Sequence, residues 1–338
     1  MSCTSPQCYL INGKGPPRKS LEDYPAGVYP GLGRVVYLPC GHCLSCRRER
    51  RQELTLLQCC EASLYHDNWF VTLTYDDDIA KDPFGCPIRR LCKWHIQEFV
   101  ERMRKGLKYQ GISSCRIFGC GEYGDTYGRP HYHFSLFGVH PAVLGISDDS
   151  DAVLARRDYL DLSELRSVRL SARDSNGNHY WHSPFIAARW PYGNHMIYRA
   201  CRETYQYIAG YVVKKLSGEK QKYIVPEFQF QSRPSIGYPW FLQYCNALSN
   251  VDGDRLINDV LEIAGQAWKC PRIFDRWLER MDHFNGPMAV QRIKRLRQLS
   301  QEHLPDRNKL KRKADFEIYR DMVASVVNKQ KKKGLKDE

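Results

Sequence analysis

Two histidines one residue apart, His131 and His133, could together bind a metal ion. They begin the segment 131–138, whose aromatic and apolar residues are typical of a β-strand, and residues two apart in a strand point to the same face. Glu122 lies nine residues upstream, at the end of another expected strand, and antiparallel pairing would place its carboxylate beside them as a third ligand. The alternative is that both histidines are partly buried structural residues.

Two imidazoles and one carboxylate with open positions form a mixed nitrogen and oxygen site. Such a site suits Mg²⁺ or Mn²⁺, and an ion held there can polarise a phosphate oxygen. We therefore expect Glu122, His131 and His133 to be the ligands of one divalent ion.

Two tyrosines, Tyr207 and Tyr211, form a second candidate group in the segment 202–216, which is expected to be helical. Side chains four apart lie on one helical face, with Cβ atoms about 5–6 Å from each other, and Lys214 lies one turn beyond Tyr211 on that face. This face can present two phenolic nucleophiles and a cation to one phosphate. The alternative is that the tyrosines only pack the helix against a sheet.

Three cysteines at intervals of three residues, Cys40, Cys43 and Cys46, form a third group. Zinc in a closed structural site takes four soft ligands, and we expect Cys3 to complete the set, with Cys8 or His42 as substitutes. The alternative is that the three are reduced thiols at the start of a helix.

The chain carries 51 Lys and Arg against 38 Asp and Glu among 338 residues, a formal charge of +13. This excess favours a polyanionic partner, above all nucleic acid. No apolar stretch approaches the roughly 18 residues of a membrane span, and the first twenty residues lack a signal-peptide core. We therefore expect a cytoplasmic protein without membrane contact, in which the 14 cysteines bind metal or remain free thiols.

Basic residues cluster in two places. Residues 292–333 contain 14 Lys or Arg against five Asp or Glu. We expect such clusters to neutralise DNA phosphates, although a charge run can also be a solvated surface. The residues expected to bind DNA in this way are Arg47, Arg48, Arg50, Arg51, Lys311, Arg312 and Lys313.

The patterns around these groups predict the elements that must position them. Apolar spacing predicts helices over residues 46–65, 94–109 and 202–216, and β-branched and aromatic runs predict strands over 69–75, 115–121 and 131–138. Glycine and proline make residues 1–39 an irregular arm, and residues 140–195 are typical of a polar insertion with a hairpin. Aromatic loops up to about residue 252 and then amphipathic helices are expected after Pro226.

Together these elements predict an α+β fold with a central antiparallel sheet flanked by helices. A small cysteine-rich arm precedes the sheet, and a helical basic region follows it. The expected divisions are 1–60 for the arm and basic helix, 61–220 for the sheet domain with its insertion, and 221–338 for the helical basic region.

Three motifs stand in an order that resembles the HUH endonucleases. They are Phe70–Tyr75, then Gly121–Gly124 followed by Arg129–Phe134, and finally Tyr207–Lys215; in addition, Pro39–Arg47 looks like the cysteine motif of one HUH group. That group comprises the replication initiators of microviruses, the gokushovirus-like phages with single-stranded DNA. The resemblance extends from Cys3 to about Lys215 and is poor afterwards.

The resemblance implies an HUH-type sheet and a nick-and-join reaction on single-stranded DNA. Tyr207 or Tyr211 would attack the scissile phosphate, leaving a 5′-phosphotyrosine and a free 3′-OH that primes rolling-circle synthesis. The Mg²⁺ or Mn²⁺ site would polarise that phosphate, and Lys214 would help to activate the phenol. Tyr211 is the preferred single nucleophile, because Lys214 follows it at the spacing seen in one-tyrosine relatives.

The implied partners are single-stranded DNA and a replication origin, in the cytoplasm of a bacterial host. Because the sequence has no Gly-x-x-x-x-Gly-Lys-[Ser/Thr] loop, a host helicase would have to separate the strands, and a host DNA polymerase would extend the primer. Two rival hypotheses remain: an HUH relaxase or transposase, and a non-catalytic zinc-containing nucleic-acid-binding protein that stacks bases on Tyr75, Tyr123 and Tyr132.

Overall fold

The computed structural model describes residues 3–4, 6–11, 18–19, 27–29, 33–112, 115–124, 127–146, 170–173, 179–214, 227–249, 260–263 and 266–280. The chain divides into two compact units. We call residues 51–215 with 219–251 the sheet unit, and residues 1–50, 216–218 and 252–338 the cysteine unit.

A seven-stranded antiparallel sheet forms the centre of the sheet unit, in the order β11-β6-β7-β5-β10-β9-β8. The strands are β5 Asn68–Thr74, β6 Arg116–Tyr123, β7 Pro130–Phe137, β8 Leu170–Arg173, β9 His179–Trp181, β10 His195–Arg199 and β11 Phe228–Gln231. The expected α+β class with a central antiparallel sheet between helices is therefore confirmed.

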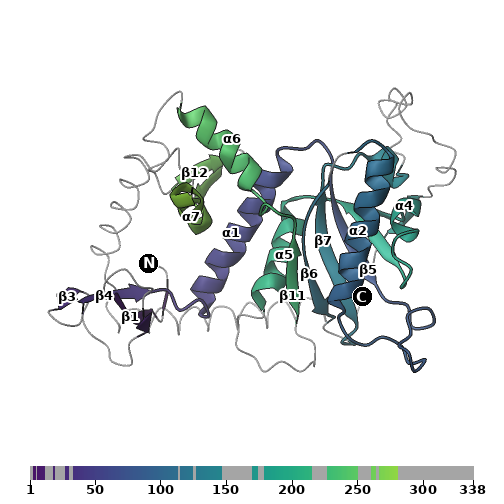
Figure 1. Ribbon diagram of the computed structural model, residues 1–338, viewed down its shortest axis with the longest axis horizontal. Helices are drawn as coiled ribbons and strands as arrows, with labels where there is room; N and C mark the ends of the chain where they lie inside the picture. Colours follow the sequence, from purple (N-terminus) through teal and green to yellow (C-terminus); the bar gives the residue numbers. More distant parts are fainter. Residues whose placement is uncertain are drawn as a thin grey trace, which may run out of the picture. The chain divides into compact units, whose positions relative to one another are not determined.

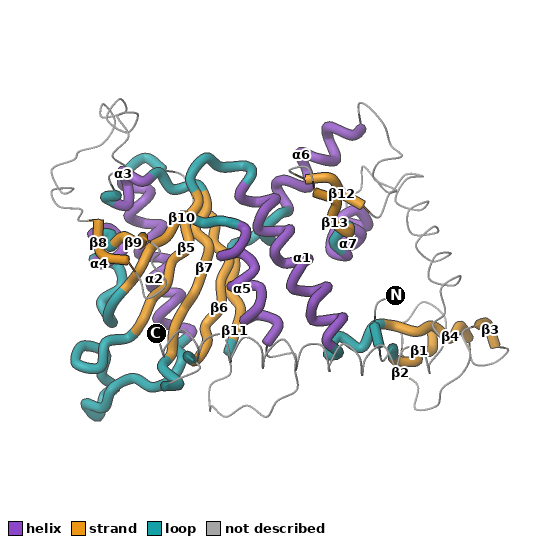
Figure 2. Tube along the Cα trace, turned by 180° about the vertical axis from the view of Figure 1, so that it is seen from behind, coloured by secondary structure: helices purple, strands orange, loops and turns teal. Residues whose placement is uncertain are grey.

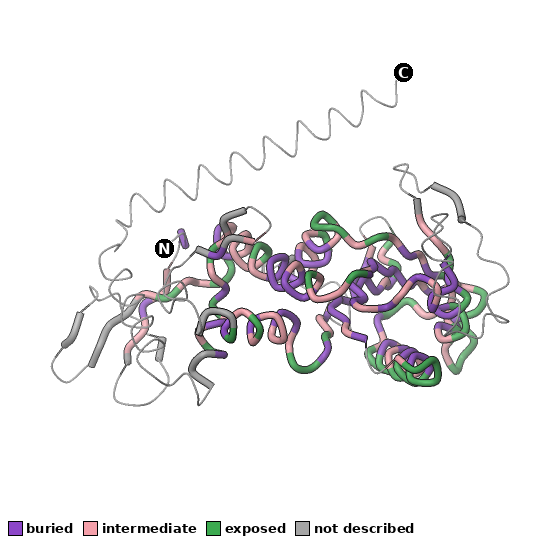
Figure 3. The backbone as a smooth tube through the Cα atoms, turned by 90° about the horizontal axis from the view of Figure 1, so that it is seen from above, coloured by how far each residue is buried: buried purple, intermediate pink, exposed green. Residues whose placement is uncertain are grey.

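One face of this sheet is apolar and packs on helix α2, Lys93–Tyr109. Alternation in β5 places Trp69, Val71 and Leu73 on this face, where they join one buried cluster with Phe99 and Met103 of α2. The short helices α3, Pro141–Leu144, and α4, Pro184–Ala187, add to the same cluster. This cluster is the main hydrophobic core, and the buried residues in Figure 3 mark it.

The opposite face packs against helices α1, Leu44–Ala62, and α5, Arg202–Lys214. Gln58 of α1 accepts a hydrogen bond from Ser135 of β7 at 2.8 Å, and Tyr205 of α5 packs on Phe137. Figures 1 and 2 show α2 and α5 on opposite sides of the sheet. This second face carries more polar residues, and it is the face on which the candidate site lies.

A buried ion pair fixes α1 to the sheet. Glu61 of α1 is fully buried and pairs with Arg116 of β6. The second Glu61 oxygen accepts the Gly237 N–H at 2.7 Å, and Arg116 donates to the carbonyl of Pro234 at 2.8 Å. The pair therefore also holds the segment that leads into helix α6, Tyr238–Ser249.

The described part of the cysteine unit contains two small sheets and a helix. Strands β1 Gln7–Ile11, β2 Arg18–Lys19, β3 Gly27–Tyr29 and β4 Gly33–Leu38 form an antiparallel sheet in the order β2-β1-β4-β3. Strands β12 Val260–Ile263 and β13 Gln266–Lys269 pair with each other, and helix α7 is Arg272–Arg280. The first turns of α1 belong to this unit, where Glu49 accepts hydrogen bonds from Lys269 and Arg272.

Three segments differ from the sequence-based expectation. The irregular arm is wrong, because β1 pairs with β4 over five residues although more than twenty residues separate them. A hairpin, β8 with β9, does occur within the expected insertion, but residues from Ser183 onward belong to the core: Trp190 is buried, and β10 pairs with β5. Residues 228–231, expected as a loop, form edge strand β11 beside β6.

The basic tail, including Lys311, Arg312 and Lys313, lies outside the described residues. Its expected role in DNA binding therefore stays a prediction. Among the helices of the described part, none has the length and apolarity needed to cross a membrane.

Replacing Arg116 by alanine should lower the free energy of unfolding of the sheet unit by about 3–5 kcal/mol, because it leaves the buried Glu61 carboxylate without its cation. Urea unfolding followed by tryptophan fluorescence measures this change. Arg102→Ala is the matched control, because Arg102 forms a partly exposed i,i+4 pair with Glu98, and pairs of that kind contribute about 0.5 kcal/mol. Equal losses in the two variants would contradict the role of the buried pair.

Candidate active site and cysteine cluster

Glu122, His131 and His133 come together on the α5-facing side of the sheet. Strands β6 and β7 pair so that Glu122 stands directly opposite His131, and His133 follows two residues along on the same face. Glu122 is 3% and His133 7% exposed. The juxtaposition expected from strand alternation and antiparallel pairing is therefore present in the structure.

His133 is held from both sides by hydrogen bonds. Its Nε2 lies 2.8 Å from Glu122 Oε1, and its Nδ1 lies 2.9 Å from Thr72 Oγ1 on β5. Burial lowers the pKa of His133 to about 4, so the ring is neutral at neutral pH. Because a carboxylate only accepts hydrogen bonds, the Nε2 proton goes to Glu122, and Nδ1 accepts from the Thr72 hydroxyl.

His131 has a different partner. Its Nδ1 lies 2.7 Å from the carbonyl oxygen of Arg129, which can only accept, so Nδ1 carries the proton and Nε2 keeps its lone pair. Burial lowers the pKa of His131 as well. The rings of His131 and His133 lie parallel, with centroids 6.1 Å apart. Two neutral imidazoles and a carboxylate fit a divalent ion, and sharing one requires the His131 ring to turn toward the Glu122–His133 pair.

Tyr207 and Tyr211 of α5 stand beside His133. Their ring centroids lie 5.3 Å and 5.9 Å from that of His133, and the Tyr211 hydroxyl donates to the Tyr207 hydroxyl at 3.2 Å. Tyr207 is 42% exposed. The helix thus places both phenols on one face, as expected, and brings them to the histidine from more than seventy residues along the chain.

The third tyrosine of this helix has a structural environment. Tyr205 is buried, and burial raises the pKa of its phenol. Its backbone carbonyl accepts a hydrogen bond from Gln58 of α1 at 3.1 Å. Lys214 is the last residue of α5, and its side chain lies outside the described part, as does Lys215.

The basic residues of α1 are not alike. Arg51 donates from Nε to the backbone carbonyl of Gln206 at 3.0 Å and so helps to hold α5 in place. Arg47, Arg48 and Arg50 are half-buried on the same helix. Phosphate binding by these four residues stays a prediction, and Arg51 has a positioning contact that its spacing did not indicate.

Two site residues, Thr72 and Phe70, were not identified from the sequence. Thr72 is the cross-strand partner of His133, and Phe70 stacks on the His133 ring with centroids 5.6 Å apart. The same Phe70 ring meets Tyr207 edge-on at 5.8 Å. Alternation in β5 already placed both on one face, but only the register between β5 and β7 shows which histidine they touch.

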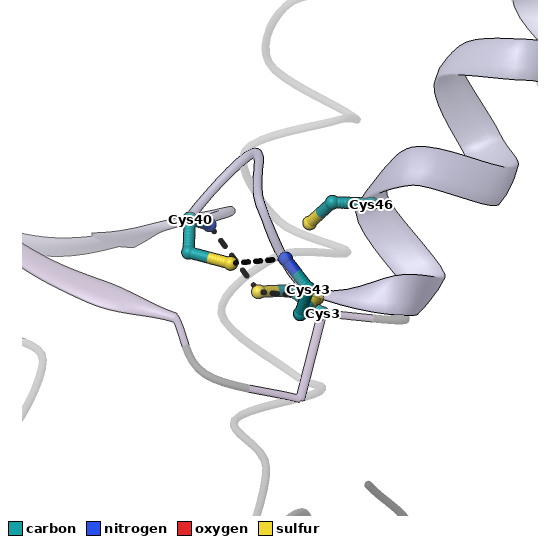
Figure 4. A group of neighbouring side chains, drawn as sticks. All are labelled: Cys3, Cys40, Cys43 and Cys46. Atoms are coloured by element: carbon teal, nitrogen blue, oxygen red, sulfur yellow. Dashed lines mark hydrogen bonds between the residues drawn. The ribbon is translucent and has the colours of Figure 1, made fainter. Parts of the chain in front are cut away.

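The four expected zinc ligands form a compact group in the cysteine unit. The sulfur atoms of Cys3, Cys40, Cys43 and Cys46 all lie within 4.8 Å of one another. In Figure 4 they turn toward a common centre at the start of α1, and the Cys3 and Cys43 sulfurs are 3.8 Å apart. A tetrahedral zinc with bonds of about 2.3 Å needs sulfurs about 3.8 Å apart. The cluster can therefore hold a metal ion such as zinc.

The surroundings of the cluster favour a thiolate. Burial alone would raise the pKa of the Cys43 thiol, but hydrogen bonds from Thr4 and Cys46 lower it to about 6. The backbone N–H groups of His42 and Cys43 also donate to Cys40 Sγ, at 3.4 and 3.2 Å. Cys8 and His42, the expected substitutes, are not in the group of four.

Comparison with known proteins defines the class. Residues 68–216, which contain Glu122, both histidines and both tyrosines, match the family of replication-associated proteins that is described by its member ORF2. The chain is therefore related to phage replication-associated proteins, which confirms the resemblance to phage replication initiators.

Three curated proteins show the relationship in detail. The Replication-associated protein ORF2 of Spiroplasma virus 4 is 28% identical over 72% of this chain and 68% of its own length. The Replication-associated protein VP4 of Bdellovibrio phage phiMH2K is 29% identical over 61% of this chain and 58% of its own. The Replication-associated protein ORF4 of Chlamydia phage 1 is 34% identical over 31% of this chain and 25% of its own. No solved structure matches the chain significantly.

Purified protein should contain about one zinc ion per chain, and Cys43→Ser should remove most of it, because a hydroxyl is a poor substitute for a thiolate ligand. Elemental analysis by mass spectrometry measures the content. Cys86→Ser is the control, since Cys86 is exposed and lies outside the group of four. Absence of zinc from the unaltered protein, or its retention in Cys43→Ser, would contradict the assignment.

Proposed function

We propose that this protein initiates rolling-circle replication by nicking and rejoining single-stranded DNA with a tyrosine nucleophile, in the manner of HUH endonucleases. The observation that carries the proposal is the pair of tyrosines on α5 beside the buried Glu122–His133 pair. Nucleophile and ligand candidates come from three separate motifs, and they converge on one face of the sheet.

The phenol of Tyr207 or Tyr211 attacks the scissile phosphate and loses its proton. The new bond joins the tyrosine oxygen to phosphorus, and the bond to the 3′ oxygen breaks, so that this oxygen takes up a proton and becomes a free 3′-OH. Mg²⁺ or Mn²⁺ held by Glu122, His131 and His133 would polarise the phosphate. Lys214 is proposed to help activate the phenol, and attack by a 3′-OH on the phosphotyrosine rejoins the strand.

Two adjacent tyrosines suit repeated rounds. One can hold the 5′ end while the other cuts the regenerated origin, and their hydroxyls, 3.2 Å apart, can exchange roles without movement of the backbone. The origin, single-stranded DNA, a host helicase and a host polymerase are the partners that this function requires, in the cytoplasm of a bacterial host.

The rival functions have less support. A relaxase or transposase would share the chemistry, but the curated relatives are named replication-associated proteins. A non-catalytic protein that stacks bases on Tyr75, Tyr123 and Tyr132 conflicts with the burial of all three side chains. Tyr75 and Tyr132 also hydrogen-bond to each other at 2.9 Å inside the core.

Incubation with Mn²⁺ and a pool of random single-stranded oligonucleotides should give a covalent protein–DNA band on a denaturing gel. Tyr207→Phe and Tyr211→Phe should each keep some adduct and the double variant none, because phenylalanine keeps the packing and removes only the attacking oxygen. Tyr205→Phe is the matched control on the same helix and should keep full adduct. An undiminished adduct in the double variant, or DNA mapped to another tyrosine, would contradict the assignment.

Thr72→Val should weaken Mn²⁺ binding by about 10- to 100-fold, because it removes the hydroxyl that orients the His133 ring while keeping the shape of the side chain. Calorimetric titration of Mn²⁺ into zinc-loaded protein measures this. Thr72→Ser keeps the hydroxyl and should bind almost normally, and His131→Ala combined with His133→Ala is the reference without a site. Equal binding by Thr72→Val and Thr72→Ser would show that the hydroxyl does not support the ligand.

A further inference from the structure

A cavity of about 510 Å³ opens at the end of β5 and β7, next to the candidate metal ligands. Thr74 and His131, which face each other across these two strands, border it. Arg89, Arg129 and the run Asp76–Asp78 form much of the rest of its lining. The mechanism proposed above uses none of these groups except His131.

Two arginines at this cavity are fixed by one carboxylate. Asp77 Oδ2 accepts from Arg129 at 2.6 Å and from Arg89 at 2.9 Å. One carboxylate cannot neutralise two guanidinium groups, and both arginine side chains are about half exposed. N–H groups of both arginines are therefore available to an anionic ligand.

An exposed aromatic side chain stands beside the same arginines. Tyr127 is 85% exposed and, together with Arg89 and Arg129, lines a second hollow of about 460 Å³. Aromatic rings next to cationic groups are the usual means of binding single-stranded nucleic acid, since bases stack on the ring and the backbone follows the charges.

The charges indicate what the cavity takes. Two arginines and three aspartates line it, so its net charge is negative although its arginines are not neutralised. A phosphate alone would be repelled by the aspartates, whereas a nucleotide can direct its phosphate to the arginines and the amino group of its base to a carboxylate. The volume is also in the range of small-molecule sites.

We propose that this cavity binds one nucleotide of single-stranded DNA next to the scissile phosphate, and that it prefers a base with an amino group over thymine. This inference rests on the proposed nicking function, because His131 joins the cavity to the metal ligands. Arg89 and Arg129 contact the backbone, Tyr127 stacks on the adjacent base, and Asp77 is a positioning residue for the two arginines.

Fluorescence anisotropy with labelled dC12 and dT12 tests the proposal on the full chain. Salt at about 0.3 M suppresses the sequence-independent contribution of the basic tail. We expect dC12 to bind at least about fivefold more tightly than dT12, and Arg129→Gln and Tyr127→Ala each to weaken dC12 binding about fivefold or more.

Two matched controls remove the same groups elsewhere on the sheet unit. Lys105→Gln removes one exposed positive charge from α2, and Tyr109→Ala removes a tyrosine that is 91% exposed at the end of that helix. Both should change dC12 binding less than twofold. If Arg129→Gln has no more effect than Lys105→Gln, or Tyr127→Ala no more than Tyr109→Ala, the nucleotide site is overturned, and equal binding of dC12 and dT12 overturns the base preference.

Anisotropy needs no cleavage, so this test is separate from that of the nicking reaction. A protein that forms no covalent adduct but shows these binding differences would lose the proposed function and keep the nucleotide site. A protein that forms the adduct and shows none of the differences would keep the function and lose the site.

Discussion

The register between β6 and β7 is the constraint on which the candidate site depends. It sets Glu122 opposite His131 and Cys120 opposite His133, and the neighbouring register sets Thr72 opposite His133. Because side chains alternate along a strand, a slip of one residue would move His133 to the apolar face beneath α2 and bring Tyr132 or Phe134 to the face beneath α5. The large apolar side chains of β7 oppose such a slip, so core packing on one face fixes the chemistry on the other.

The two faces of the sheet therefore contribute differently. The α2 side is apolar and supplies most of the hydrophobic stabilisation, whereas the α5 side buries polar groups that need partners. Those partners are present: Ser135 donates to Gln58, and Glu61 pairs with Arg116. Burial also keeps His133 neutral, which is the form that binds a metal ion.

Local patterns predicted the parts of the site that depend on local geometry. Alternation predicted that His131 and His133 share a face, helical spacing predicted the same for Tyr207 and Tyr211, and cysteine spacing predicted the group at the start of α1. Pairing between distant segments was less accessible. The β1–β4 sheet, the edge strand β11 and the role of Thr72 all depend on which strand lies beside which, and no short window of sequence contains that information.

The hydroxyl groups of Tyr207 and Tyr211 are so close that they limit how much DNA the pair can hold. With 3.2 Å between the two oxygens, two simultaneous esters would place two charged phosphate groups almost in contact in a site shielded from solvent on one side. Repulsion between them makes the second ester unfavourable until the first is released. The stoichiometry of covalent attachment is then one strand end per chain, set by the helix itself and not by any signal from the replication machinery.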